Sequence, residues 1–529
     1  MNRRALLAAS LVLACCFPAG QKVAGAAGSG IDCLATTGGV DLLTATVPQL
    51  ARALATGRFT SRGLTKAYLR RIRAFDHGTV KINAVRRLTS DALKQADSSD
   101  ARRRRHRTLG PLDGIPVILK DNIGTRDAPT TAGSIALAGN VPKREATLVS
   151  RLRAAGAVIL AKTNLSEFAN WVDPSMPNGY SSLGGQVVNP YTEGDPSGSS
   201  SGSGAGEALG YAAVAVGTET SGSILSPSDA ESLVGIKPTV GLVSRRGVIP
   251  LAQSFDTAGP MARNVTDAAS LLQAMAGRDP SDAPFDEAPG GPPVRPDYLS
   301  ALRPGALRGT QLGYSPADVN SLPADQATVF NRALADLRAA GAVLVTTNTL
   351  SNTSLAGLTE LSEIPNEFKF GVNHYLANDA GPGLPVKNLT DIVIYNQQHP
   401  QQMKYGQRFI IASDATPGIY GEPTALASRT VTIESSRYAI DSVLSAHQLD
   451  AYLTPGAFYA NIGAAAGYPT VIVPMGFVGS GARAPMGIGF LGSAWTERSL
   501  IALAFDYERV SHRRQQPTAV NHRLLSSVC

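Results

Sequence analysis

The sequence predicts one α/β domain, in which helices flank a sheet of buried strands. Two stretches, RLRAAGAVILA from Arg151 and DLRAAGAVLVT from Asp336, each show a helical pattern that ends at a glycine and continues into an apolar run. Each is therefore predicted to be a helix followed by a buried strand. The chain has 529 residues, 43% of them hydrophobic, which is sufficient for a large core.

A third stretch, residues 60–76, predicts an amphipathic helix that covers the sheet. Its apolar residues recur at helical spacing behind a hydroxyl cap, Thr60 or Ser61. These apolar residues are Leu64, Tyr68, Ile72 and Phe75. Residues 277–297 are rich in proline, glycine and acidic residues, so we expect an exposed connection there. Strand and helix patterns of the same kind stand on both sides of it, which favours a single domain.

The N-terminus predicts an export signal over residues 1–26. A charged start, MNRR, precedes the apolar ALLAASLVLACC, and the small residues AGAAG suit cleavage near Ala26. A disordered or buried N-terminal helix is the alternative. We expect a periplasmic or extracellular mature chain of residues 27–529. NRRALL resembles a twin-arginine signal and VLAC a lipoprotein box, but both matches are weak, so the route stays open and lipoprotein anchoring is disfavoured. No later segment is long enough to span a membrane.

The charge of the chain argues against a nucleic-acid partner. The formal charge is +7, and three of the positive charges lie in the predicted signal. The tract RRRRHR at 102–107 stands between a helical pattern and the turn GPLDG, so we interpret it as a solvated loop rather than a polyanion site. The sequence contains no HExxH motif and no clustered Cys/His spacing, so no metal and no cofactor are predicted.

Lysine 120 is the first candidate for chemistry. The apolar run from Ile115 to Leu119 predicts a buried strand that ends in Lys120. Burial favours the neutral amine, which is a usable general base. The alternative is a lysine at a strand end whose ammonium group reaches water.

The second candidate region alternates glycine and serine from Ser197 to Gly206. It leads directly into the apolar YAAVAVGT, which argues against a flexible linker. Its GSSSG formally matches the nucleophile elbow of α/β-hydrolases, with Ser200 at the centre. The elbow requires a buried strand just before it, whereas VVNPYTEGDPS precedes it here. None of the downstream histidines lies in a motif that marks it as catalytic. They are His374, His399, His447, His512 and His522.

The third candidate region is TETSGS, residues 218–223. Gly222 before Ser223 allows successive backbone N–H groups to converge on one point, where a developing oxyanion is stabilised. A serine at the rim of such a site is placed to attack. The alternative is that these serines cap a turn or a helix.

In this order and spacing the three regions resemble the amidase signature family. The resemblance covers nearly the whole mature chain. It rests on GPLDGIPVILKDNIGT, LAKTNLSEFAN, GDPSGSSSGSGAG, VGTETSGSILSPSDAESLVGIKPTVGLVSRRGVIPLAQSFDTAGPMARNVTDAA, AAAGYPTVIVPMGF and PMGIGFLGSAWTERSLIALAFDYE. The segments GSSSGS, GTET and KPTVGLVSR most resemble the corresponding segments of bacterial peptide amidases. The implied fold is a single domain with a large twisted mixed sheet covered by helices on both sides.

The resemblance also implies the catalytic residues. It assigns Lys120, Ser199 on a cis peptide bond, and the nucleophile Ser223 to a Ser–cisSer–Lys triad, with Ser200 supporting the geometry. The oxyanion hole would be formed by the N–H groups of Thr220, Ser221, Gly222 and Ser223. Ser221 stands where many relatives have glycine or aspartate, and Leu225 where fatty-acid-amide hydrolases often have arginine, so subfamily likeness does not define the substrate.

Three functions are compatible with these residues. The first is an exported amidase that acts on small-molecule amides or on C-terminal amides of peptides through an acyl-enzyme. The second is an esterase with the same triad, and the third a silent binding protein, which would be expected to have lost Lys120 or Ser223. The predicted signal argues against a role in glutamyl-tRNA amidotransferase. Residues Glu360 to Leu376 are a candidate wall of the substrate pocket, and the oligomeric state is open.

The cysteines allow one disulfide in the mature chain. Cys15 and Cys16 lie in the predicted signal, which leaves Cys33 and Cys529, each close to a mature terminus. Chain termini often lie near each other and exported proteins retain disulfides, so we predict a Cys33–Cys529 bridge. Two free thiols are the alternative.

Overall fold

A computed structural model of the chain describes residues 32–282, 288–293, 297–350, 353–479 and 484–527, with the backbone alone at 353–362. The predicted export signal, residues 1–26, therefore lies outside the described residues, as does Cys529. Cys33 is disulfide-bonded. The pairing with Cys529 stays a prediction.

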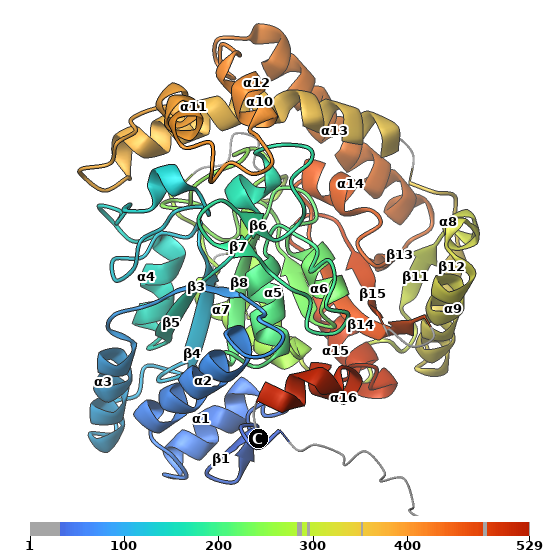
Figure 1. Cartoon of the computed structure of the whole chain (residues 1–529). Coiled ribbons are helices and arrows are strands. Elements are labelled where there is room, and N and C mark those ends of the chain that lie inside the picture. Colours follow the sequence, from blue (N-terminus) through green and yellow to red (C-terminus); the bar gives the residue numbers. More distant parts are fainter. Residues whose placement is uncertain (1–31, 283–287, 294–296, 351–352, 480–483, 528–529) are drawn as a thin grey trace, which may run out of the picture.

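A mixed sheet of eleven strands forms the centre of the described chain, which confirms the predicted α/β class (Figure 1). In spatial order the strands are β12 (Val343–Thr346), β11 (Gln311–Tyr314), β13 (Ala451–Pro455), β15 (Ala484–Leu491), β14 (Thr470–Val478), β9 (Val234–Lys237), β10 (Thr257–Ala262), β8 (Val214–Glu219), β4 (Pro116–Lys120), β5 (Val158–Thr163) and β3 (Val85–Leu88). Strand β4 runs parallel to β5 and to β8, so the ends of β4 and β8 meet at one edge of the sheet.

Helices pack on both sides of the sheet. They are α1 (Val47–Ala55), α2 (Ser61–Asp76), α3 (Ala92–Arg104), α4 (Thr147–Ala154), α5 (Ser201–Ala208), α6 (Leu225–Ala230), α7 (Val265–Met275), α8 (Pro316–Ser321), α9 (Ala324–Ala339), α10 (Thr353–Asn378), α11 (Leu389–Gln398), α12 (Arg408–Asp414), α13 (Pro423–Ala446), α14 (Ala460–Ala465), α15 (Glu497–Ser511) and α16 (Pro517–Val520). Helices α10 to α13 lie together at the top of Figure 1, and α14 packs against α10 and α13. Two hairpins of two-residue strands complete the fold: β1 (Thr36–Thr37) with β2 (Val40–Asp41), and β6 (Tyr180–Ser181) with β7 (Gly185–Gln186).

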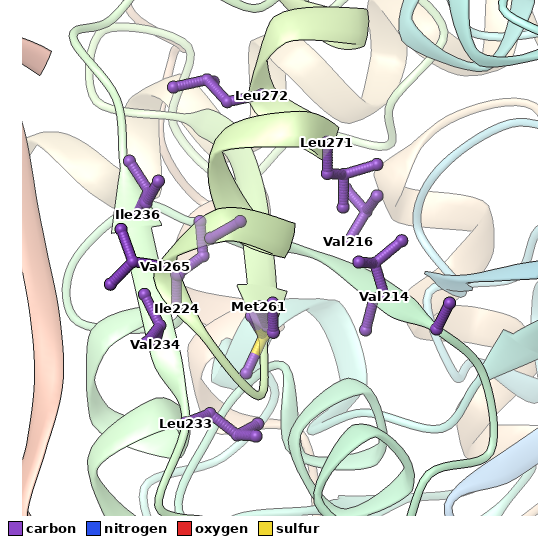
Figure 2. Close-up of a cluster of buried hydrophobic side chains, with 14 of the residues drawn as sticks. Val214, Val216, Ile224, Leu233, Val234, Ile236, Met261, Val265, Leu271 and Leu272 are labelled. Carbon is purple, nitrogen blue, oxygen red and sulfur yellow. The ribbon is translucent and has the colours of Figure 1, made fainter. Parts of the chain in front are cut away.

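Strand β8 shows how the two faces of the sheet are used. Its residues alternate between faces, and Figure 2 shows Val214 and Val216 beside Leu271 of α7. Gly217 points to the other face, where a Cβ atom would lie 2.9 Å from Ser200 Oγ at the start of α5. One face of β8 therefore packs in the core, and the other faces the serine-rich loop.

Helix α2 confirms the third observation from the sequence. Thr60 is its N-cap, and the Thr60 side chain accepts a hydrogen bond from Gly63 N at 3.0 Å. The four predicted apolar residues are buried, and α2 packs against β4. This helix covers the strand that ends in Lys120.

Both helix–glycine–strand stretches form as predicted, but only one of the strands is buried. Helix α4 turns at Gly156 (φ 84°) into β5, and α9 turns at Gly341 (φ 97°) into β12. All of β5 is buried, whereas Val343 in β12 is 50% exposed. The prediction of a second buried strand was wrong because β12 is the edge of the sheet.

The arginine tract at 102–107 is only partly the loop that we expected. Arg102 to Arg104 form the last turn of α3, where Arg102 pairs with Asp113 at 2.5 Å and Arg103 donates to the Asp113 carbonyl at 2.9 Å. Residues 104–107 are exposed. Cations favour a helix C-terminus, which explains why the helix continues into the tract.

The described residues of the 277–297 connection form no helix or strand, and most are exposed or half-buried. Asp279 accepts hydrogen bonds from the hydroxyls of Thr147 (2.8 Å) and Ser244 (2.7 Å), so this segment is fixed to the domain at its start. None of the helices in the described ranges combines the length and the hydropathy of a membrane-spanning segment.

Candidate active site

Lys120 is the last residue of β4 and its side chain is completely buried. Its Nζ donates to Ser199 Oγ at 2.7 Å and to the Thr218 carbonyl at 3.2 Å. Burial lowers the pKa of Lys120 to about 7, although the carboxylates of Asp256 and Glu219 act in the opposite direction. The alternative of an ammonium group that reaches water is therefore wrong. A large fraction of this amine is neutral near pH 7 and able to accept a proton.

Ser199 precedes α5 in a loop whose Gly198–Ser199 peptide bond is cis. The Ser199 carbonyl accepts a hydrogen bond from Ser166 N at 3.1 Å. A Cβ atom at Gly198 would lie 2.6 Å from Ser166 Oγ, so only glycine permits this close approach. The loop is thereby held with the Ser199 hydroxyl against Lys120.

Ser200 ties this loop to the end of β8. Its hydroxyl donates to the Thr218 carbonyl (3.0 Å) and accepts from Thr218 N (3.2 Å), and its own N–H donates to the Ser223 carbonyl (3.3 Å). The Ser200 side chain is buried, and no strand directly precedes it. A nucleophile elbow needs an exposed hydroxyl at the end of a strand, so the structure contradicts the elbow interpretation.

Ser223 lies in the turn between β8 and α6, directly after Gly222 (φ 75°). It is 7% exposed, and its hydroxyl makes no hydrogen bond to any residue in the described part of the chain. The structure therefore brings Ser199 to Lys120 and the backbone of Ser223 to Ser200. It does not join the hydroxyls of Ser199 and Ser223 by a hydrogen bond.

The N–H groups of residues 220–223 are the ones that we expected to form the oxyanion hole, and this assignment stays a prediction. Among the described residues, none of the four donates to a backbone carbonyl. Burial raises the pKa of the Glu219 carboxyl group, and a backbone hydrogen bond from Gly222 N acts in the opposite direction, so this amide is already engaged. The N–H groups of Thr220, Ser221 and Ser223 remain available for a ligand oxygen.

Sequence reasoning missed the residues that hold these groups in place. Asn122 donates to Thr218 Oγ1 at 3.0 Å, and Thr220 Oγ1 donates to Asp256 Oδ1 at 2.5 Å. Asp256 also accepts from Leu251 N at 2.9 Å, and burial raises its pKa. No sequence signal marks Asp256, whereas Thr218 and Glu219 lie inside the TETSGS region and were passed over in favour of its serines.

A second buried lysine supports the neighbouring strand. Lys162 of β5 pairs with Asp121, the residue after Lys120, at 3.1 Å and donates to Thr130 Oγ1 at 2.8 Å. Arg86 contacts the same carboxylate. Burial lowers the pKa of Lys162 to about 8. These contacts fix the chain just beyond Lys120.

The candidate pocket wall at 360–376 lies within α10, and the side chains of 360–362 are outside the described part. Glu367 is buried and accepts a hydrogen bond from Ser254 N at 2.9 Å, two residues from Asp256. Burial raises the pKa of Glu367 to about 7. Phe368 packs edge-on against Phe168, with 5.5 Å between the ring centroids. Helix α10 is thus joined to the segment that supports Thr220.

In the described ranges, no group of three or more His, Cys, Asp or Glu side chains could hold a metal ion.

Comparison with known proteins identifies the family to which this arrangement belongs. The sequence model of the Amidase family matches residues 63–501. The chain belongs to the amidase family. This amidase is 40% identical to the native peptide amidase of Stenotrophomonas maltophilia, with a TM-score of 0.84 over 90% of this chain and 98% of that one.

Two curated relatives show how broad the family is. The amidase is 38% identical to a protein named probable amidase from Arabidopsis thaliana, over 89% of this chain and 91% of that protein. It is 31% identical to one of the subunits of glutamyl-tRNA(Gln) amidotransferase from Moorella thermoacetica, over 91% of this chain and all of that protein. The amidase is therefore a hydrolase of amides, as the sequence predicted, and the identity of its substrate has to come from its own site.

Proposed function

We propose that the protein is an exported amidase that hydrolyses linear carboxylic amides, including C-terminal amides of peptides, through a Ser223–Ser199–Lys120 triad. The 2.7 Å contact between the buried Lys120 amine and the Ser199 hydroxyl carries the proposal. Export stays a prediction from residues 1–26. The peptide-amide substrate is suggested by the 40% identity to a peptide amidase over most of the chain.

The first chemical step is acylation. Neutral Lys120 takes the proton of Ser199, and Ser199 takes that of Ser223. The Ser223 hydroxyl has no competing partner in the described chain, so it is able to turn towards Ser199 when substrate binds. Ser223 Oγ then attacks the amide carbonyl, while the N–H groups of Thr220, Ser221 and Ser223 receive the developing negative charge.

The second part of the reaction releases the two products. The proton held by Lys120 returns through Ser199 to the departing amine, so the carbon–nitrogen bond breaks without expelling an amide anion. Water then attacks the acyl-enzyme by the same proton path in reverse. The buried triad keeps bulk water away from Lys120, which preserves its neutral form between turnovers.

A substrate panel tests this function. Primary amides, anilides, peptide amides and esters are compared on one preparation, with released ammonia or amine measured beside released acid. We expect equal amounts of ammonia and acid from primary and peptide amides. Hydrolysis of the esters alone would contradict the proposal and favour an esterase on the same triad.

The pH dependence follows from the pKa of Lys120. Because the base acts only when neutral and its pKa is lowered to about 7, kcat/KM should fall as the pH drops through about 7 and reach a plateau above it. The measurement is a profile of kcat/KM between about pH 5 and about pH 9, which covers both sides of the pKa of Lys120 and shows the fall in rate on the acid side. Activity that stays constant down to pH 5 would show that a neutral lysine is not required.

A further inference from the structure

Asp229 is a carboxylate on the helix that follows the nucleophile, and no step of the proposed reaction uses it. It lies near the end of α6, the helix that begins two residues after Ser223, and its side chain is half-buried. Its Oδ1 accepts a hydrogen bond from Gly487 N of β15 at 2.5 Å. Its Oδ2 accepts none within the described chain, and this atom is not sealed from solvent.

The accessible face of α6 begins at the nucleophile turn. Ser221, Ser226 and Asp229 are half-buried. Ser226 and Asp229 share one face of the helix because they are three residues apart, and Ser226 N donates to the Gly222 carbonyl at 2.7 Å. This face therefore extends from the turn of Ser223 to Asp229. The opposite face is buried and comprises Ile224, Leu225, Pro227 and Ser228.

A segment between β13 and α14, residues 456–460, lies beside the same helix. Near the nucleophile, a Cβ atom on Gly222 would lie 3.6 Å from Ala460 Cβ. At the far end, a Cβ atom on Gly456 (φ 55°) would lie 2.6 Å from Asp229 Oδ2, so only glycine leaves room for this carboxylate. The segment therefore borders α6 from the nucleophile turn to Asp229.

Phe458 stands in the middle of this segment and is 48% exposed. Its ring packs edge-on against Tyr459, with 5.1 Å between the ring centroids. Tyr459 is held in turn by a hydrogen bond from its hydroxyl to Asp318 at 2.6 Å. An exposed aromatic ring on a fixed support offers apolar surface to a ligand, so the path from the nucleophile to Asp229 has apolar surface along it.

No cation of the described chain pairs with Asp229. Burial raises the pKa of Asp229 to about 7, and the Gly487 N–H acts in the opposite direction. A positive charge beside the carboxylate would favour its ionised form and add a charge-assisted hydrogen bond. The open Oδ2 atom therefore suits a ligand that carries a protonated amine.

The position of Asp229 along α6 indicates where that amine lies in a substrate. A helical rise of about 1.5 Å per residue places Asp229 roughly 9 Å beyond Ser223. An extended peptide advances about 3.5 Å per residue, so this distance corresponds to about two to three residues. The N-terminal ammonium group of a short peptide amide reaches Asp229 when its last carbonyl group lies at Ser223.

We propose that Asp229 is a specificity-determining residue, which binds the N-terminal ammonium group of a short peptide amide while the scissile amide lies at Ser223. This inference rests on the proposed function and narrows its substrate class to short peptide amides with a free amino terminus. The acyl part of the substrate extends along the accessible face of α6, beside Phe458.

The test compares two substrates that differ in one group. Alanyl-alanyl-alanine amide carries the ammonium group, and propionyl-alanyl-alanine amide has a hydrogen atom in its place. A hydrogen bond to a charged group corresponds to about tenfold or more in affinity. We therefore expect wild-type kcat/KM to be at least about tenfold higher for the amine substrate. Released ammonia is measured at about pH 7.5, where most of the amine is protonated.

Asp229→Asn should abolish this preference. Asparagine keeps an oxygen for Gly487 N but carries no charge, so kcat/KM for the two substrates should agree within about threefold. The rate on the propionyl substrate should stay within about threefold of wild type. Glu231→Gln is the matched control, because Glu231 directly follows α6 and both of its carboxylate oxygens are enclosed without a partner in the described chain. This variant should keep the preference for the amine.

The ratio of the two rates decides the proposal, and the propionyl substrate reports on the triad alone. Equal kcat/KM values in wild-type enzyme, or a preference that survives in Asp229→Asn, would overturn the proposal. A folded Asp229→Asn that loses activity on both substrates would also overturn it, because the carboxylate would then support the nucleophile turn instead of the substrate. If Asp229→Asn does not fold, Asp229→Ala replaces it with the same expectations, since alanine favours a helix. Wild-type enzyme that hydrolyses neither substrate would refute the proposed function instead.

Discussion

Ser223→Ala should lose amide hydrolysis almost completely, by on the order of 10⁴-fold or more in kcat. The substitution removes the attacking oxygen and leaves the backbone amides of residues 220–223 in place, so KM should change little. Steady-state kinetics on a primary amide, with ammonia detected directly, give both constants. The fluorophosphonate probe, which reacts with an activated serine, should no longer label the protein.

Ser228→Ala is the matched control for that loss. Ser228 is a buried serine of α6 whose hydroxyl has no hydrogen-bond partner among the described residues. Removing an unpartnered buried hydroxyl does not destabilise a protein, so this variant should keep wild-type activity and labelling. Full labelling of Ser223→Ala together with loss of labelling in Ser200→Ala would contradict the assignment and restore the elbow interpretation.

Lys120→Met should lower kcat by at least about 100-fold, the usual scale for a lost proton-transfer group. Methionine is an unbranched apolar side chain of similar length, so it fits a site that already favours an uncharged group. The remaining activity should lose its acid limb near pH 7, because the group that titrates there is gone. A pH profile of kcat/KM measured for wild type and variant side by side shows both effects.

Lys120→Arg distinguishes the base from a simple positive charge. Arginine retains the charge but cannot be deprotonated at these pH values, so it should be as inactive as Lys120→Met. Melting temperatures report whether each variant has kept its fold. Near wild-type kcat in Lys120→Arg would mean that the lysine acts through its charge and not as a base.

The fold could be predicted from the sequence where the signals are local. Thr60 with its helical spacing, and the glycines that end α4 and α9, each act within a few residues, and these elements form as predicted. The exposure of β12 was not predictable in this way. A strand is exposed when it lies at the edge of a sheet, and strand order is set by contacts such as β4 beside β8, about one hundred residues apart.

The residues of the candidate site, like the elements of the fold, could be predicted only where their signal was local in the sequence. Lys120 was visible because a lysine at the end of an apolar run is unusual, and Ser223 because a glycine precedes it in a turn. The sequence pattern alone did not show which of Ser199 and Ser200 belongs to the catalytic triad. Only the resemblance to the family assigned Ser199 to it. Asp256 gave no signal, because its contact with Thr220 joins two segments that are 36 residues apart.

The most direct test of the central claim is to identify the residue that becomes covalently modified. Wild-type enzyme is inactivated with a fluorophosphonate and digested, and the adduct is located by tandem mass spectrometry. We expect one adduct, on Ser223, formed in proportion to the loss of activity. It should form more slowly at about pH 5 than at about pH 8, because these two assay values lie on either side of the pKa of Lys120 at about 7. An adduct on Ser199 or Ser200, or inactivation with Ser223 unmodified, would contradict the account.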